Sequence, residues 1–124
     1  MQNIKFIYLY RDPGNYKKWA QIVFSNSKEL GLDSIVTELQ AAFLQDGLFI
    51  AHQIRVPDVF FCSSGNATSD DHCFHEFHGV EESLEAPNDI YSRSVGQFLA
   101  EVNREAKRGW VAFDPRDALQ RRSN

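Results

Sequence analysis

The N-terminal stretch Ile4–Tyr10 restricts the fold most, because it is β-branched or aromatic at nearly every position. Successive side chains of a strand point to opposite faces, and both faces of this segment are apolar, so a largely buried strand is expected. Asp12–Asn15 follows with proline and glycine, which favour a tight turn. Lys18–Phe24 then returns to strand-forming residues. Together these segments predict a β-hairpin at the start of the chain.

Two later segments carry apolar residues at helical spacing. In the first, Asp33 or Ser34 is the expected N-cap and Gly47 the expected end. In the second, Ser94 has a glutamine three residues later, as in a capping box, and Gly109 is expected to close the helix. The apolar stripes are Ile35, Val36, Leu39, Ala42 and Phe43 in the first helix, and Val95, Phe98, Leu99, Val102 and Ala106 in the second.

The segments between the two helices predict the rest of the sheet. Leu48–Val56 and Cys73–Val80 are expected strands, Val59–Cys62 is a short strand candidate, and Glu81–Tyr91 is an acidic connector. The element order is therefore β-β-α-β-(β)-β-α. Because each helix has one apolar face, we predict an α+β two-layer sandwich, with both helices on one face of a mainly antiparallel sheet.

With 124 residues, 43% of them apolar and ten of them phenylalanine, the chain has enough material for one core. We expect a single domain over residues 1–113 and a frayed polar tail over residues 114–124. Charged residues make up 24% and the net charge is −4, a balance that excludes the disordered class.

The sequence also bears on the cellular compartment. The apolar run Ile4–Tyr10 is interrupted by Lys5 and is too short for a signal peptide or a membrane span, so no membrane contact is expected. Two cysteines without a secretory context predict reduced thiols and a cytoplasmic location. A disulfide between Cys62 and Cys73, closing a hairpin, is the alternative.

Charge is unevenly distributed along the chain. Val56–Ser92 contains eight acidic residues and no lysine or arginine, whereas Arg104–Arg122 contains six of the thirteen basic residues. One interpretation is a solvated acidic loop followed by a helix end whose cations complement the helix dipole. The alternative is an acidic face for a cationic partner, or a basic tail for an anionic partner.

The segment Asp70–His78 has the highest density of groups that bind metals or move protons, including three of the four histidines. The zinc-protease motif His-Glu-x-x-His needs histidines four apart on a helix, but His75 and His78 are three apart in a segment that alternates like a strand. On a strand, the three histidines do not share one face. We therefore expect core packing and surface decoration, with a divalent transition metal as the alternative. The ligands in that alternative would come from Asp71, His72, Cys73, His75, Glu76 and His78.

Other catalytic and binding signatures are absent from the sequence. Ser63–Gly65 lacks the Gly-x-Ser-x-Gly elbow, and no glycine-rich phosphate loop occurs. The hairpin sets lysines and an arginine beside tyrosines and a tryptophan, as in sheets that stack nucleic-acid bases. Because the isoelectric point is about 5.5 and no ribonucleoprotein motif occurs, nucleic-acid binding is not expected.

The turn Tyr10–Lys17 is the second segment with candidate binding groups. Tyr-Arg-Asp-x-Gly-Asn-Tyr-Lys, the Val-Phe-Ser-Asn of Val23–Asn26 and the Asp-His-x-x-His-Glu-Phe of Asp71–Phe77 resemble a family of small uncharacterised bacterial proteins. The resemblance covers Ile4–Glu82 and implies a bacterial cytoplasmic protein, without an activity or a mechanism. It also implies that the hairpin turn and the histidine-rich segment belong to one design. The candidate binding residues are Arg11, Asp12, Asn15, Tyr16 and Trp19.

The leading functional hypothesis is a non-enzymatic protein-binding or regulatory module that contacts an unknown protein partner or forms a homodimer. It is based on the missing catalytic motifs, the abundant aromatic residues and the segregated charge. The first alternative is a metal-binding protein or metal-assisted hydrolase that uses the Asp71–His78 segment. The second is single-stranded nucleic-acid binding through the hairpin.

Overall fold

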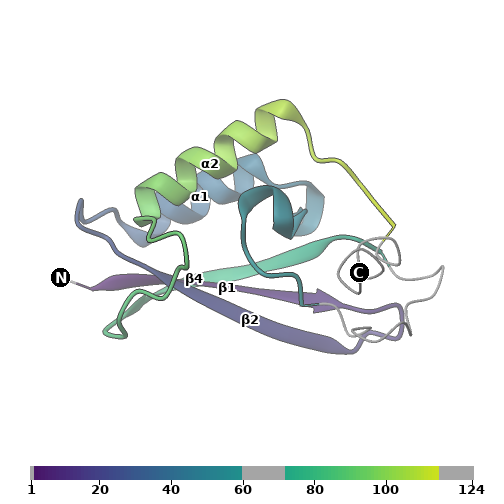
Figure 1. The fold of residues 1–124 in the computed structure, drawn as a ribbon, viewed down its shortest axis with the longest axis horizontal. Helices are drawn as coiled ribbons and strands as arrows, with labels where there is room; N and C mark the ends of the chain where they lie inside the picture. The colour runs from purple at the N-terminus through teal and green to yellow at the C-terminus, as the bar shows by residue number, and fades with distance from the viewer. Residues whose placement is uncertain (1, 60–71, 115–124) are drawn as a thin grey trace.

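The computed structural model describes residues 2–59 and 72–114. Within these residues, four strands form one sheet in the order β2-β1-β4-β3, and every neighbouring pair is antiparallel. Both helices cover the same face of this sheet (Figure 1). The predicted α+β sandwich is thus confirmed. The elements are β1 Asn3–Arg11, β2 Lys17–Phe24, α1 Leu32–Ala42, β3 Leu48–Phe49, β4 His75–Ser83 and α2 Val95–Arg108, with 3₁₀ turns at Gln45–Gly47 and Ala51–Ile54.

The N-terminal hairpin forms as the sequence predicts. β1 and β2 pair from Ile4 opposite Phe24 to Arg11 opposite Lys17. The turn is closed by the backbone N–H of Asp12, which donates to the carbonyl of the tyrosine four residues later at 2.9 Å. β1 is an inner strand of the sheet, because β4 pairs with its other edge.

The core lies between the sheet and the two helices and is mainly aromatic. The Phe6 ring on β1 lies 5.0–6.4 Å from five other aromatic rings, measured between centroids. Burying one such side chain contributes about 1.5–3 kcal/mol to stability, so this cluster is a major part of what holds the two layers together. The rings around Phe6 are Tyr8, Phe43, Phe49, Phe77 and Phe98.

The predicted start of α2 is confirmed, whereas the predicted start of α1 is wrong. α2 has the predicted capping box, in which the Gln97 N–H donates to the Ser94 hydroxyl at 3.2 Å. The N-cap of α1 was predicted wrongly: it is Gly31, which makes no side-chain cap bond, so the helix begins before Asp33 and Ser34.

The C-terminal end predicted for α1 was also wrong. The helix ends at Ala42, because the buried Phe43 leaves the helix to pack on the sheet and the Trp110 indole N–H donates to the Ala42 carbonyl at 3.1 Å. Gly47 instead lies in the following 3₁₀ turn, with a φ of 75°.

The strand predictions after α1 also need correction. Of Leu48–Val56, only Leu48–Phe49 is a strand, because the chain then turns through Ala51–Ile54 to bury its apolar side chains under α2. β4 begins two residues later and ends three residues later than the predicted Cys73–Val80, so part of the acidic connector belongs to the strand. Val59 lies outside any strand. The rest of that short strand candidate, and the tail from residue 115 onward, lie outside the described residues.

Candidate functional site

The face of the sheet opposite the helices, which we call the open face, carries two of the five predicted binding residues, Arg11 and Trp19. β-sheet partners directly across from one another share a face, and Leu9 on β1 lies opposite both Trp19 on β2 and Glu76 on β4. Two residues further along β1, Arg11 lies opposite Lys17. The open face is therefore an aromatic and charged surface beside the hairpin turn.

At the hairpin end, four of the candidate residues form two hydrogen-bonded pairs, Arg11 with Asn15 and Asp12 with Tyr16. Arg11 makes a bidentate pair with Glu76, from Nε to Oε1 at 3.2 Å and from Nη2 to Oε2 at 3.1 Å. Its remaining Nη1 donates to the Asn15 side-chain oxygen at 2.5 Å. The hydrogen bond to Glu76 raises the pKa of Arg11, so the guanidinium stays charged. The Asp12 carboxylate accepts from the Tyr16 backbone N–H at 2.8 Å, which orders the turn.

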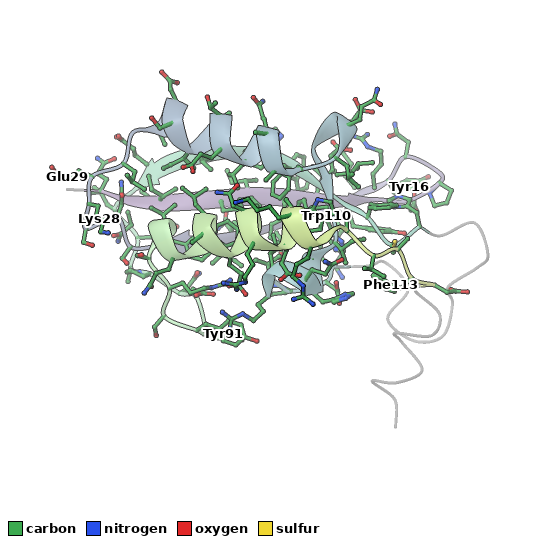
Figure 2. All side chains as sticks on the ribbon, turned by 90° about the horizontal axis from the view of Figure 1, so that it is seen from above. Tyr16, Lys28, Glu29, Tyr91, Trp110 and Phe113 are labelled. Carbon is green, nitrogen blue, oxygen red and sulfur yellow. The ribbon has the colours of Figure 1, made fainter. Side chains whose placement is uncertain are left out.

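The two exposed aromatic residues of the hairpin, Trp19 and Tyr16, differ in their contacts with the rest of the protein. The Trp19 side chain is 51% exposed, yet its ring meets the edge of the His78 ring at a centroid distance of 4.8 Å. Their strands flank β1, so the two rings meet across the open face above it. Leu9 on β1 is almost fully buried. Tyr16 lies at the hairpin tip and is largely exposed (Figure 2).

The free edge of β2 is only partly covered. The Val23 N–H and C=O point outward and bond the side chain and backbone of Asn88, at 2.8 and 3.0 Å. Because outward groups alternate along an antiparallel strand, the backbone groups of Gln21 and Trp19 face the same edge. Lys17 and Lys18 are exposed at its hairpin end, and lysines on an edge strand oppose strand addition.

Two of the three clustered histidines are engaged inside the protein. The His72 Nε2 bonds the Arg11 carbonyl at 2.7 Å, and its Nδ1 accepts the Phe74 N–H at 3.1 Å. His75 is fully buried, and its Nε2 accepts the Val59 N–H at 2.9 Å. His78 lies on the open face instead, as described above, so the structure places the three histidines in three different surroundings.

The remaining metal candidates are likewise separated. Cys73 is buried with a free thiol, and desolvation raises its pKa, so the thiol stays protonated and is a weak nucleophile. Glu76 is paired with Arg11, while Asp71 and Cys62 lie outside the described residues. Among residues 2–59 and 72–114, no three histidine, cysteine or acidic side chains gather where they could hold a metal ion.

Sequence reasoning missed a buried ion network below α2. All five N–H groups of Arg93 are used: they donate to both Asp89 oxygens, to Glu101, and to the carbonyls of Ile54 and Arg55, at 2.8–3.0 Å. Glu101 also bonds the Arg55 guanidinium at 2.5 and 2.9 Å. A sequence signal existed, because Arg93 is the first basic residue after the acidic segment Val56–Ser92.

The network changes the acidity of its two carboxyl groups. Burial alone would raise the pKa of Asp89, but the hydrogen bonds from Arg93 outweigh it and leave that pKa below its ordinary value. Burial likewise opposes ionisation of Glu101, and the hydrogen bonds from Arg55 and Arg93 again lower its pKa. Both carboxyl groups are therefore ionised at neutral pH, and Arg93 stays charged.

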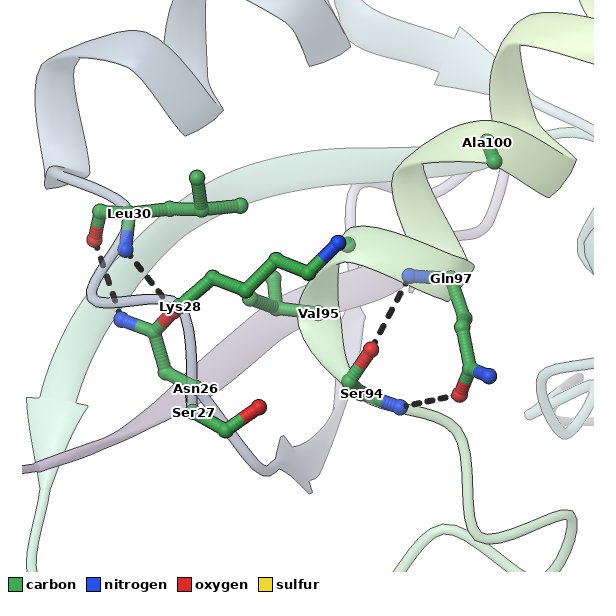
Figure 3. A pocket seen from close by; sticks show the side chains of 9 residues that line it. Asn26, Ser27, Lys28, Leu30, Ser94, Val95, Gln97 and Ala100 are labelled. Atoms are coloured by element: carbon green, nitrogen blue, oxygen red, sulfur yellow. Dashed lines mark hydrogen bonds between the residues drawn. The ribbon is translucent and has the colours of Figure 1, made fainter.

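A cavity of about 220 Å³ lies between the first turn of α2 and the loop after β2 (Figure 3). The helix N–H groups near it are largely paired, since Val95 donates to the Ser25 carbonyl and Gln97 to Ser94. Asn26 beside it bonds both backbone groups of Leu30. The cavity is smaller than a typical ligand pocket, and we assign it to packing between the loop and the helix.

Comparison with known proteins adds no identification. No family model, curated protein or solved structure matches the chain. Neither helix of the described residues is long and apolar enough to span a bilayer.

Proposed function

We propose that this protein is a non-enzymatic binding module that contacts protein partners through the open face of its sheet. The observation that carries the proposal is Trp19, which is half-exposed and yet held in place by the β-sheet and by His78. Tryptophan, tyrosine and arginine dominate the energetics of protein interfaces. Here Tyr16 and Arg11 lie on the same hairpin as Trp19.

Three of the groups that could perform acid–base or nucleophilic chemistry favour the same interpretation. Cys73 and His75 are buried, and both ring nitrogens of His72 are bonded to backbone groups. Catalysis needs a nucleophile and a base that reach the substrate together. In the structure, the rings of His72 and His75 instead bond backbone groups and so hold segments of the chain together.

A second copy of the chain is the first partner to test. A two-fold axis in the plane of the interface and parallel to the strands would bring the open faces of two copies together, with β2 of one copy over β4 of the other. Trp19 would lie inside this contact. We favour this face-to-face arrangement over pairing of β2 edges, which would bring lysines together.

The test is the molar mass of the full chain, measured by light scattering over a range of protein concentrations. We expect a dimer that Trp19→Ala weakens by roughly 30-fold or more, the loss of one interface hot spot. Val111→Ala is the matched control, because Val111 is also an exposed apolar residue but lies beyond α2. This control should dimerise like the wild type.

If the wild type stays monomeric, the homodimer is rejected and another protein partner is sought. Affinity capture would then compare wild type, Trp19→Ala and Val111→Ala. A protein retained by the control and lost from the Trp19 variant would support binding through the open face. Equal capture by all three would refute it, and saturable turnover abolished by a single substitution would refute the non-enzymatic proposal.

A further inference from the structure

A second surface, separate from the open face, lies along the flank of α2. It consists of Ile90 and Tyr91 in the loop before the helix and of three arginines, one against the Tyr91 ring and two on α2, which together we call the arginine strip. Tyr91 lies below α2 in Figure 2, away from Tyr16 at the hairpin end. The three arginines are Arg55, Arg104 and Arg108.

Side-chain contacts link Tyr91 to Arg55 and Arg55 to α2. The Arg55 guanidinium lies 4.4 Å from the centre of the Tyr91 ring and bonds Glu101 on α2. Arg104 approaches the same Glu101 at 3.8 Å. One turn further along the helix, Arg108 pairs with Glu105 at 3.2 Å.

The loop that carries the apolar part of the strip is held firmly. Asp89 and Arg93, which flank Ile90 and Tyr91 in sequence, are locked into the buried network described above. Ile90 nevertheless projects into solvent with 83% of its surface exposed. A large aliphatic side chain on a fixed backbone costs little entropy to bury, which is typical of a pre-organised binding surface.

In the arginine strip the cations are exposed and the acids are buried. The side chains of Arg55, Arg104 and Arg108 are 46%, 60% and 73% exposed. Their carboxylate partners are withdrawn beneath them, with Glu101 at 7% and Glu105 at 10%. The most exposed charges of the strip are therefore positive, on a chain whose net charge is −4.

We propose that the arginine strip binds an acidic segment of a partner protein, whose aliphatic or aromatic side chain covers Ile90 and Tyr91. Arg104 makes no hydrogen bond among the described residues, and Arg108 uses only one of its terminal nitrogens. Their open N–H groups match the two oxygens of a carboxylate. Tyr91 and Ile90 supply the apolar contact that such an interface needs at its centre.

The observations favour a protein over a nucleic acid. Polyanion binding usually spreads many cations over a backbone, whereas this strip has three exposed arginines above buried acids. A solvent-exposed isoleucine beside them has no phosphate or sugar to match. The remainder of the chain is acidic overall and would repel a long polyanion.

The test uses a library of random 12-residue peptides displayed on phage and selected on the wild-type full chain. Affinities of the recovered peptides are then measured for wild type and for the triple variant Ile90→Ser, Arg104→Gln and Arg108→Gln. Two controls match the triple variant in kind: Leu84→Ser removes an equally exposed aliphatic residue, at 85%, and Lys28→Gln removes an exposed cation elsewhere. A labelled single-stranded oligonucleotide is titrated in parallel.

We expect peptides rich in aspartate and glutamate with at least one large apolar residue. Their affinity should fall about tenfold or more in the triple variant, remain unchanged in both controls, and weaken as salt rises. The proposal is overturned if no peptide is recovered, if the peptides are not acidic, or if the triple variant binds them as well as the wild type does. Oligonucleotide binding that is lost in the triple variant would assign the strip to nucleic acid and also overturn it.

Discussion

Replacing Arg93 should lower the stability of this fold, because its side chain joins two buried carboxylates. Arg93→Met keeps an apolar stem of similar length but removes the cation between Asp89 and Glu101, which are both nearly excluded from solvent. Removing one partner of a buried ion pair typically costs about 3–5 kcal/mol, because the other charge stays buried. Against a total stability of about 5–15 kcal/mol for a domain, this loss is large.

The assay is urea unfolding followed by tryptophan fluorescence. With a slope of about 2 kcal/mol per molar urea, the midpoint at pH 7 should fall by roughly 1.5–2.5 M. Arg104→Met is the matched control, because it removes an exposed arginine that only approaches the same Glu101 at 3.8 Å. The control should lose no more than about 0.5 kcal/mol.

Acidification provides an independent check with a definite sign. In the wild type the pKa of Asp89 is lowered on folding, so its stabilisation is present above the unfolded pKa and is lost as pH falls through the folded pKa. Without Arg93, burial dominates and should raise that pKa, so protonation relieves the buried charge. The difference in stability between wild type and Arg93→Met should therefore shrink between pH 7 and pH 4.

Two results would refute this reasoning. The first is a loss for Arg93→Met no larger than that for Arg104→Met, since the network would then contribute nothing that an exposed arginine does not. The second is a stability difference that grows in acid. A further substitution, Asp89→Asn in the Arg93→Met background, should recover part of the loss at pH 7 by removing the unpaired charge.

Two further predictions test the ends of the helices. Ser94→Ala should remove the capping box of α2 and cost about 1 kcal/mol, seen as a lower melting temperature, while Ser27→Ala, which removes an exposed hydroxyl, should leave it unchanged. Trp110→Phe should cost about 1 kcal/mol in urea unfolding, because the indole N–H that bonds the Ala42 carbonyl is lost. Trp19→Phe is its control and should leave stability nearly unchanged; an equal loss would show that ring size, and not the hydrogen bond, is responsible.

Strong local signals predicted much of the architecture. The hairpin turn combines proline, glycine and asparagine within Asp12–Asn15: proline restricts its own φ, whereas glycine and asparagine tolerate a positive φ, which Asn15 adopts at 67°. The capping box at Ser94 likewise involves residues only three positions apart. Such features are short-range, so they could be recognised before any tertiary contact was known.

The run Leu48–Val56 shows where local pattern was insufficient. A segment rich in apolar residues suits a buried strand or a buried turn equally well, because both hide most of its apolar side chains from water. Only Leu48–Phe49 pairs with β4, and the remainder of the segment folds under α2. The early end of α1 has a similar origin, since Trp110 and Phe43 lie far apart in sequence and meet at the same helix end.

The candidate site was predicted in part. Arg11, Asp12, Asn15 and Tyr16 were named as candidates within one turn, and in the structure Arg11 bonds the Asn15 side chain while Asp12 bonds the Tyr16 backbone. The partner of Arg11 is Glu76, 65 residues away, and no spacing rule could assign it. The separation of His75 from His78 did follow from strand alternation, which places neighbouring side chains on opposite faces.

By itself, the sequence determined the hairpin, the two amphipathic helices and their place on one face of a sheet, because periodicity and turn chemistry act between near neighbours. Only the tertiary structure decided where charges would be buried. Asp89, Arg93 and Glu101 look like ordinary surface residues until the loop, the turn after β3 and helix α2 meet around one guanidinium. A buried charge depends on every group that surrounds it, and those groups come from all parts of the chain.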